Sequence, residues 1–539
     1  MTISSSSTVF LRQNIQFEPL VNDWYAWFLT VPPVTAALNI AERFLPIMKS
    51  YVASPAMHAA ACKNPAMRGG PFINLDGKRV DEIRTLIAET TQRSARLIEF
   101  AQALKTLWTL LLEQAKGLTM DPLYPQVPQI LRGYVELYYD LNHNPSYRVF
   151  ESLLYASPFY ETGLQSIALS AIDDSTLRPF ILSTPRLKDS HTVFRKMPFA
   201  DPVLDELFRM KRAARRYSEI AECFGIEGDV EPLFRSFFTE QAPEPKPDRD
   251  FDGEDIRIRY FGHACLLIQS RGVSILIDPA VSYGFETRLP RYTFADLPDR
   301  IDYVLITHSH HDHIILETLL QLRHQIKTVI VGRNFDGFPQ DPSLQLALRK
   351  LGFAQVVEVR DIEEIAISNG SIIAVPFLGE HNDLSIQSKN AFLVRFGSRS
   401  VLCVADSCNL DSRLYEHVFD ITDQPDILFV GMEVAGAPPS WVYGPLFPKP
   451  LPRAIDQSRR ARGCNLNEAA ALVDRFTFKQ IFIYAMGQEP WLDHILDNTF
   501  SDDSPSLIQS KQFLGHCKAR GIQAESLFAI KEVMVCQNG

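Results

Sequence analysis

The sequence predicts an α+β protein with an N-terminal mainly α domain followed by an αββα sandwich, and three observations support this prediction. Apolar residues recur at helical spacing through residues 1–240, whereas short β-branched runs dominate residues 253–539. A proline-rich acidic segment, residues 241–252, separates the two regions and is predicted to be a linker. Four of the thirteen histidines fall within residues 308–313, directly after a predicted strand, which indicates where the chemistry lies.

The length and composition are those of an ordinary soluble protein that is too long for one core. Among 539 residues, 46% are hydrophobic and 22% are charged, and the net charge is −10. This negative charge argues against nucleic acid as the main partner. No apolar run reaches the length of a membrane span, and residues 1–8 lack the parts of a signal peptide. We therefore expect a cytoplasmic protein with no membrane partner and mostly reduced, buried cysteines.

The N-terminal region carries helical patterns and no catalytic cluster. Its clearest apolar stripes lie in residues 22–51, interrupted once by Pro32-Pro33, and in residues 80–118. Further helices are predicted at 127–139, 203–224 and 230–238, and an edge strand at 10–17. Because this region has many aromatic residues but no chemistry, we expect it to serve dimerisation or partner docking.

The C-terminal region alternates strands with helices. The predicted strands are 256–261, 265–269, 273–277, 303–306, 328–331, 356–359, 372–376, 391–396, 400–404, 427–430 and 480–484. The predicted helices are 314–322, 342–351 and 467–476, the last beginning at an asparagine cap. Few parallel crossover units occur, and this arrangement favours an αββα sandwich.

The strongest functional signal is an H-x-H-x-D-H motif after the strand at 303–306. His308 and His310 point to the same side of an extended turn, so their imidazoles can converge on one cation. Asp312 and His313 begin the next apolar run and can reach a second cation. The motif therefore predicts two adjacent metal ions, whereas the intervening histidine at position 311 should face away. A solvated histidine-rich loop is the alternative interpretation.

The motif resembles the signature of the metallo-β-lactamase superfamily, whose members hold one or two metals between two β-sheets flanked by helices. The resemblance implies further ligands at two strand ends, one at Glu380 or His381 and one at Asp406, which would bridge both metals. Successive side chains of an extended backbone diverge, so only one of the first two should bind. His263 and Asp278 are expected to orient the ligand imidazoles, with a core histidine and a strand-ending turn as the alternatives.

More closely, the chain is similar to the dinuclear-iron β-hydroxylases of the chloramphenicol-biosynthesis type, which pair an α-rich N-terminal domain with a metallo-β-lactamase-fold domain and use a glutamate at the place of Glu380. This resemblance covers nearly the whole chain and implies six metal ligands: His308, His310, Asp312, His313, Glu380 and Asp406. Three imidazoles with three carboxylates form an oxygen-rich shell that suits iron better than zinc or manganese, which are the alternative metals.

The chain departs from the zinc enzymes of this superfamily after its last predicted central strand. Residues 484–491 replace the histidine expected there, which leaves an open position on the second metal. His494, one turn further, is an alternative ligand. Residues 431–452 form a long loop with Trp441, Tyr443 and Phe447 that is predicted to wall the substrate site.

Glu433 stands at the start of this loop. It is predicted to bind a substrate amine, and a buried structural carboxylate is the alternative.

The resemblance implies a non-haem dinuclear-iron, O2-dependent monooxygenase with two iron ions. Its expected substrate is an aminoacyl group on a carrier (thiolation) domain of a nonribosomal peptide synthetase, hydroxylated at the β-carbon during antibiotic biosynthesis. An external electron donor and a homodimer are also expected. Two alternatives are a zinc or manganese metallo-hydrolase of a phosphoester, lactone or thioester, in which a bridging hydroxide attacks, and a metal-bearing docking protein without turnover.

Overall fold

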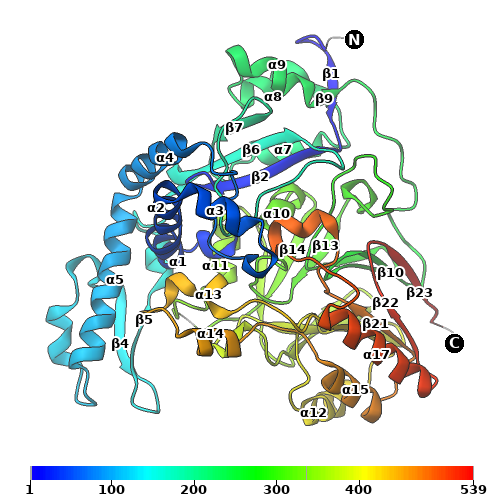
Figure 1. Ribbon diagram of the computed structural model, residues 1–539. Coiled ribbons are helices and arrows are strands. Elements are labelled where there is room, and N and C mark those ends of the chain that lie inside the picture. The colour runs from blue at the N-terminus through cyan, green and yellow to red at the C-terminus, as the bar shows by residue number, and fades with distance from the viewer. Residues whose placement is uncertain (1–2, 336, 538–539) are drawn as a thin grey trace.

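The structure is a computed structural model that describes residues 3–335 and 337–537, and its C-terminal half contains two stacked seven-stranded sheets (Figure 1). In order across the sheet, the first consists of β15 (Val356–Val359), β14 (Ile326–Gly332), β13 (Ile301–Ile306), β12 (Val273–Ile277), β11 (Cys265–Ser270), β10 (Ile256–Gly262) and β23 (Lys531–Val535). The second consists of β16 (Glu364–Ile367), β17 (Gly370–Pro376), β18 (Asn390–Phe396), β19 (Arg399–Cys403), β20 (Ile427–Gly431), β21 (Gln480–Tyr484) and β22 (Gln523–Ser526). Strands β12 to β15 run parallel, as do β19 to β22, so their carboxyl ends meet at common edges.

Helices cover both outer faces, which confirms the predicted αββα sandwich. Side chains alternate between faces along each strand, and the inner faces of the two sheets share one apolar core that includes Ile275, Leu305, Phe392 and Phe429. The second sheet is covered by α12 (Arg413–Thr422), α15 (Leu466–Arg475) and α17 (Pro505–Ala519). The first is covered by α10 (Leu316–Leu322) and α11 (Leu344–Lys350). Three short helices lie in connecting segments: α13 (Pro439–Val442), α14 (Arg453–Ser458) and α16 (Asp493–Leu496).

Most of the C-terminal strands lie within two residues of their predicted positions, and the edge strands β16, β22 and β23 were missed. Their exposed and half-exposed positions alternate, as in Glu364–Ile367 and Gln523–Ser526, so no buried apolar run signals them. The helix predicted to begin at the cap Asn467 is α15, but its cap is Asn465, two residues earlier, whose side chain forms a reciprocal capping box with Glu468.

The N-terminal half combines helices with three small sheets. Its helices are α1 (Pro33–Asn39), α2 (Leu45–Ala53), α3 (Pro55–Cys62), α4 (Val80–Arg93), α5 (Ala95–Gln114), α6 (Glu151–Tyr155), α7 (Val203–Arg209), α8 (Tyr217–Cys223) and α9 (Glu231–Ser236). The sheets are β3 (Trp24–Tyr25), β2 (Ile15–Val21), β6 (Gln165–Ala171) and β7 (Thr192–Lys196); β8 (Arg215–Arg216), β1 (Thr8–Leu11) and β9 (Phe238–Thr239); and β4 (Val135–Tyr139) with β5 (Pro145–Val149). No helix of the described residues is long and apolar enough to cross a lipid bilayer.

The helix predicted at residues 127–139 is wrong. A short 3-10 turn precedes β4 there, because Pro128 and Gly133 interrupt the segment and the apolar residues that follow alternate with polar ones. The edge strand predicted at 10–17 is instead the end of β1 and the start of β2, which lies inside its sheet; the pairing of β2 with β6 was not foreseen, since β2 is buried along its whole length and lacks the alternation of a half-exposed strand. The predicted helices at 80–118 and 203–224 are each two helices.

The two halves of the chain pack on one hydrophobic core. Phe17 and Trp24 of the N-terminal half belong to the same cluster of buried residues as Leu319 on α10 and Leu348 on α11. In Figure 1 the blue and cyan elements accordingly lie against the side of the sandwich that carries these helices. The predicted linker at 241–252 contains no helix or strand, and its role as a domain boundary stays a prediction.

Candidate metal centre

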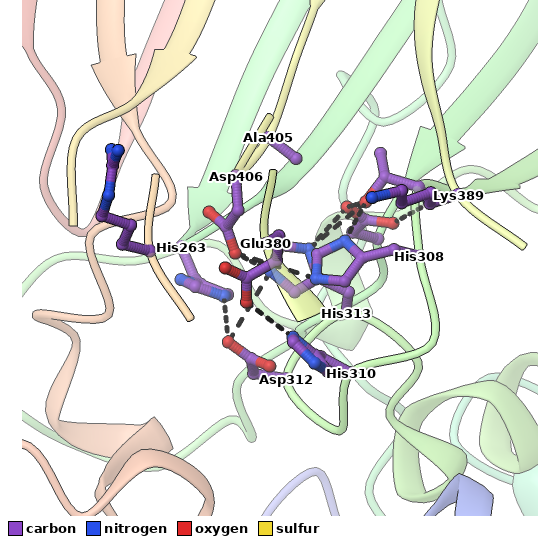
Figure 2. Close-up of polar contacts among 12 residues, drawn as sticks. His263, His308, His310, Asp312, His313, Glu380, Lys389, Ala405 and Asp406 are labelled. Atoms are coloured by element: carbon purple, nitrogen blue, oxygen red, sulfur yellow. Dashed lines mark hydrogen bonds and ion pairs between the residues drawn. The ribbon is translucent and has the colours of Figure 1, made fainter. Parts of the chain in front are cut away.

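The H-x-H-x-D-H motif occupies the loop between β13 and α10, at the carboxyl end of a central strand (Figure 2). His308 and His313 are fully buried and His310 nearly so, and Asp312 is half-buried. Unpaired polar groups are costly to bury, so such a cluster at the end of an apolar strand indicates a site built for a ligand.

One group of candidate ligands consists of His308, His310 and Glu380, whose donor atoms lie within 4.8 Å of one another. His310 Nδ1 is 2.8 Å from Glu380 Oε1, while His308 Nε2 and Glu380 Oε2 are buried with no hydrogen-bond partner among the described residues. The backbone of Glu380 has a φ of 53°, and three further residues with positive φ follow it. Such strain is found where a backbone must place a side chain at a functional site.

A second group consists of His263, Asp312 and His313, and Asp406 lies between the two groups. Asp312 Oδ2 is 3.1 Å from His263 Nε2 and 3.6 Å from His313 Nε2. Asp406 Oδ2 is 2.9 Å from His313 Nε2 and 3.8 Å from His308 Nε2, and Asp406 Oδ1 has no partner among the described residues. The structure thus brings together all six residues expected as ligands, and Figure 2 shows them converging from separate elements.

Polar contacts with neighbouring side chains hold the imidazole nitrogens that point away from the cluster. His313 Nδ1 donates to Asp278 Oδ2 at 2.8 Å, and Asp278 in turn accepts hydrogen bonds from the backbone and side chain of Thr307. His310 Nε2 lies 3.1 Å from the Tyr443 hydroxyl. Because each of these contacts fixes one nitrogen, the opposite nitrogen of the ring is left facing the cluster. Ligand imidazoles in metal sites are oriented by hydrogen bonds in the same way.

The electrostatics of the pocket favour a cation. Burial and the neighbouring imidazoles hold the pKa of His308 well below its usual value. Burial alone would raise the pKa of Asp312, but the imidazoles of His313 and His263 hold it well below its usual range. A neutral imidazole and an ionised carboxylate are the forms that ligate metals. Against the effect of burial, the surrounding carboxylates hold the pKa of His313 well above its usual value, so the site attracts positive charge.

Three other histidines occupy different environments. His311, which was expected to face away, belongs to no candidate ligand group of the described residues, and its Nε2 lies 3.1 Å from the carbonyl oxygen of Ile495. His494 on α16 is not at the cluster: its Nε2 lies 3.8 Å from Glu317, toward the N-terminal half, so the structure does not support it as a ligand. The ring of His381 packs at 4.3 Å from that of His310, yet neither of its nitrogens belongs to a candidate ligand group.

The cluster opens into a cavity of about 140 Å³ lined by ligand residues, by Glu433 and by Trp441 of the predicted wall. Phe180, from the N-terminal half, also lines this cavity, 6.1 Å from the Trp441 ring. Sequence reasoning missed Phe180 because no local pattern marks it. Burial raises the pKa of Glu433 to about 7, and its Oε1 accepts hydrogen bonds from Ala435 N and Ser506 Oγ.

Comparisons with known proteins decide between the chemistries that such a cluster allows. Residues 10–243 match the family model of the diiron non-heme β-hydroxylase N-terminal domain, and residues 257–433 match a β-lactamase superfamily domain. A 3-hydroxylase of 4-amino-L-phenylalanyl-CmlP peptidyl carrier protein from Streptomyces venezuelae is 39% identical over 526 residues, 96% of this chain and 98% of the relative. The chain belongs to the diiron β-hydroxylases.

The solved structure of a diiron β-hydroxylase has the same architecture. CmlA from Streptomyces venezuelae is similar with a TM-score of 0.90 and 38% identity over 98% of this chain and 100% of that chain. By contrast, a UPF0173 protein of Pyrococcus abyssi is 43% identical over 127 residues, only 23% of this chain and 50% of its own. The predicted hydroxylase is therefore confirmed over the hydrolase alternative. The cofactor of this diiron family fits the site, because the buried, unpartnered atoms of His308, Glu380 and Asp406 are an imidazole nitrogen and carboxylate oxygens.

Proposed function

We propose that this diiron β-hydroxylase is an O2-dependent monooxygenase that hydroxylates the β-carbon of an aminoacyl group held as a thioester on a carrier domain of a nonribosomal peptide synthetase. The observation that carries this proposal is the similarity, over 96% of the chain, to a hydroxylase of a carrier-bound amino acid. A tether makes physical sense, because a reactive metal centre needs its target C–H bond held in place and the arm supplies a high effective concentration.

The proposed ligands follow the two groups described above. His308, His310 and Glu380 would hold one iron, Asp312 and His313 would hold the other, and Asp406, which lies between the two groups, would contact both. His263 positions Asp312 through their 3.1 Å contact. When bound, the two irons would supply reductive activation of O2; with two electrons from an external donor and two protons, one oxygen atom would be inserted into the C–H bond and the other would leave as water.

The remaining residues bind and orient the substrate. Glu433 lines the same cavity as the ligands, and its carboxylate is the group that we propose pairs with the amino group of the substrate. Phe180 and Trp441 provide an apolar wall that excludes water from the reacting carbon. We further propose that the N-terminal half receives the carrier domain and forms a homodimer, which light scattering of the purified enzyme would show as twice the chain mass.

Metal analysis with Mössbauer spectra of enzyme produced in iron-supplemented cells tests the metal assignment. We expect two irons per chain with the spectrum of a coupled pair, because the oxygen-rich ligand set stabilises the higher oxidation state. Protein that holds two zinc or manganese ions and hydrolyses the thioester without O2 would contradict the proposal.

Glu380 and His381 give a matched pair of variants that tests which neighbour is a ligand. His381→Phe should keep two irons, because no described group pairs with either nitrogen of His381 and a phenyl ring fills a similar volume. Glu380→His should lower iron content and raise the ratio of zinc to iron, since it replaces a hard oxygen ligand with an imidazole. Loss of iron from His381→Phe alone would show that the wrong neighbour has been assigned.

Glu433 should impose a pH dependence on substrate binding. Its raised pKa of about 7 means that the carboxylate is ionised only above that pH. We expect kcat/KM to fall about ten-fold for each pH unit below about 7, and the Glu433→Gln variant to be slower and to lose this acidic limb. An acidic limb that persists unchanged in Glu433→Gln would assign the titration to another group.

A further inference from the structure

A second hollow, of about 570 Å³, lies beside the metal centre. It shares no described lining residue with the cavity that contains Glu433. Its walls come from the segments that follow β14, β15 and β17 and from the segment that precedes β18. We call it the Phe377 groove, because Phe377 forms part of its lining.

Phe377 connects this groove to the proposed ligands. Its ring lies 5.3 Å from the ring of His308, and the side chain is 5% exposed. Two neighbouring contacts hold the same wall against the ligand-bearing backbone: Lys389 Nζ donates to the carbonyl of Gly379, next to Glu380, and the backbone N–H of residue 390 donates to the carbonyl of residue 307. The groove therefore reaches the cluster from the side of His308, and Figure 2 draws Lys389 across the cluster from His263.

The charge of the groove is opposite to that of the chain. Arg333, Arg360 and Lys389 line it, and Asp361 is the single carboxylate of its described lining. The whole chain carries a net charge of −10. The side chain of Phe335, also in the lining, is 38% exposed. A cationic patch on an acidic protein steers acidic partners to one place and orients them. Because interfaces between electron-transfer proteins are small, a groove of this size is sufficient for such a partner.

We propose that the Phe377 groove is the docking site for an acidic one-electron carrier protein of the 2Fe–2S ferredoxin class, which delivers electrons past Phe377 to the metal centre. Each docked carrier gives up one electron, so two encounters convert two ferric ions to two ferrous ions, and no covalent bond forms or breaks. Electrons would then enter on one side of the cluster while the substrate occupies the cavity on the other. This inference rests on the proposed function, which requires an external donor.

The test measures reduction of the iron-loaded, full-length enzyme by reduced plant-type ferredoxin, without O2, in a stopped-flow spectrophotometer. Arg360 is exposed, so Arg360→Glu leaves the core intact. Its bimolecular rate constant for reduction should be about ten-fold lower than that of the wild type at low salt. At about 0.5 M salt the difference should shrink, because screening weakens interactions between exposed charges.

Two controls separate docking from damage to the centre. Lys518→Glu makes the same charge change at an exposed position of α17 and should be reduced at the wild-type rate. Reduced methyl viologen, a small cation, should reduce all three proteins equally well. Reduction of Arg360→Glu by ferredoxin at the wild-type rate in low salt would overturn the groove as the docking site. If chemically reduced enzyme then still hydroxylated its carrier-bound substrate, the proposed function would stand without it.

Discussion

The Asp406→Ala variant should lose both irons and at least about a hundred-fold of the hydroxylation rate. Asp406 is, among the described residues, the carboxylate that lies between the two groups of donors, 2.9 Å from His313 and 3.8 Å from His308. Without it each iron would keep fewer protein ligands, and the two would no longer be coupled. Iron content per chain and the optical spectrum of the purified variant measure the effect.

A matched variant guards against a trivial loss of folding. Asp420→Ala makes the same change at an exposed position of α12 and should keep two irons and full activity. If Asp406→Ala retained two tightly bound irons, the bridge would have to be assigned to another group.

The Glu317→Ala variant should lose about 3–5 kcal/mol of folding free energy, because it breaks a buried ionic network that ties the metal loop to the N-terminal half. Glu317 lies on α10, a few residues after the motif, and accepts hydrogen bonds from Arg178, Tyr25 and Tyr283. Arg178 also pairs with Glu18, and all these side chains are largely buried. Removing the carboxylate leaves a buried guanidinium with one partner fewer.

Urea unfolding followed by circular dichroism measures this loss of folding free energy. The double variant Glu317→Leu, Arg178→Met should recover part of it, because neither charge of the pair is then left without its partner. A loss below about 1 kcal/mol would show that apolar contacts alone hold α10.

The same ionic network predicts that the protein loses stability in acid. Burial alone would raise the pKa of Glu18, but the neighbouring Arg186 and Arg178 lower it from 4.5 to about 2. The stabilisation from Glu18 is therefore complete above about pH 4.5 and is lost as the pH falls toward 2.

Local sequence patterns accounted for the sandwich and for the core of the site. The strands around the motif are short apolar runs bounded by polar turns, and their burial depends on residue type more than on distant partners. The H-x-H-x-D-H spacing alone placed four donors together, since a turn after a strand fixes their directions. Glu380 and Asp406 came instead from resemblance, because two isolated acidic residues at strand ends carry no spacing signal.

Contacts between distant segments were not predictable in this way. Phe180 lines the metal cavity from a segment more than one hundred residues before the motif, and the Glu18–Arg178 pair spans 160 residues. His263 was expected to orient a ligand imidazole, yet its Nε2 lies 3.1 Å from the carboxylate of Asp312 instead. The contacts of Phe180, Glu18 and Arg178 depend on how the N-terminal half packs on the sandwich, and that of His263 depends on how two loops of the sandwich meet; periodicity and spacing encode neither.

The most direct test offers the reduced enzyme, under 18O2, the same amino acid in two forms: free, and loaded as a thioester on its carrier domain. We predict hydroxylation at the β-carbon of the loaded form alone, with one 18O atom in the product, because the tether positions the C–H bond beside the metal centre. Equal turnover of the free amino acid would remove the carrier from the proposal. Release of the amino acid by O2-independent hydrolysis of the thioester would contradict the monooxygenase itself.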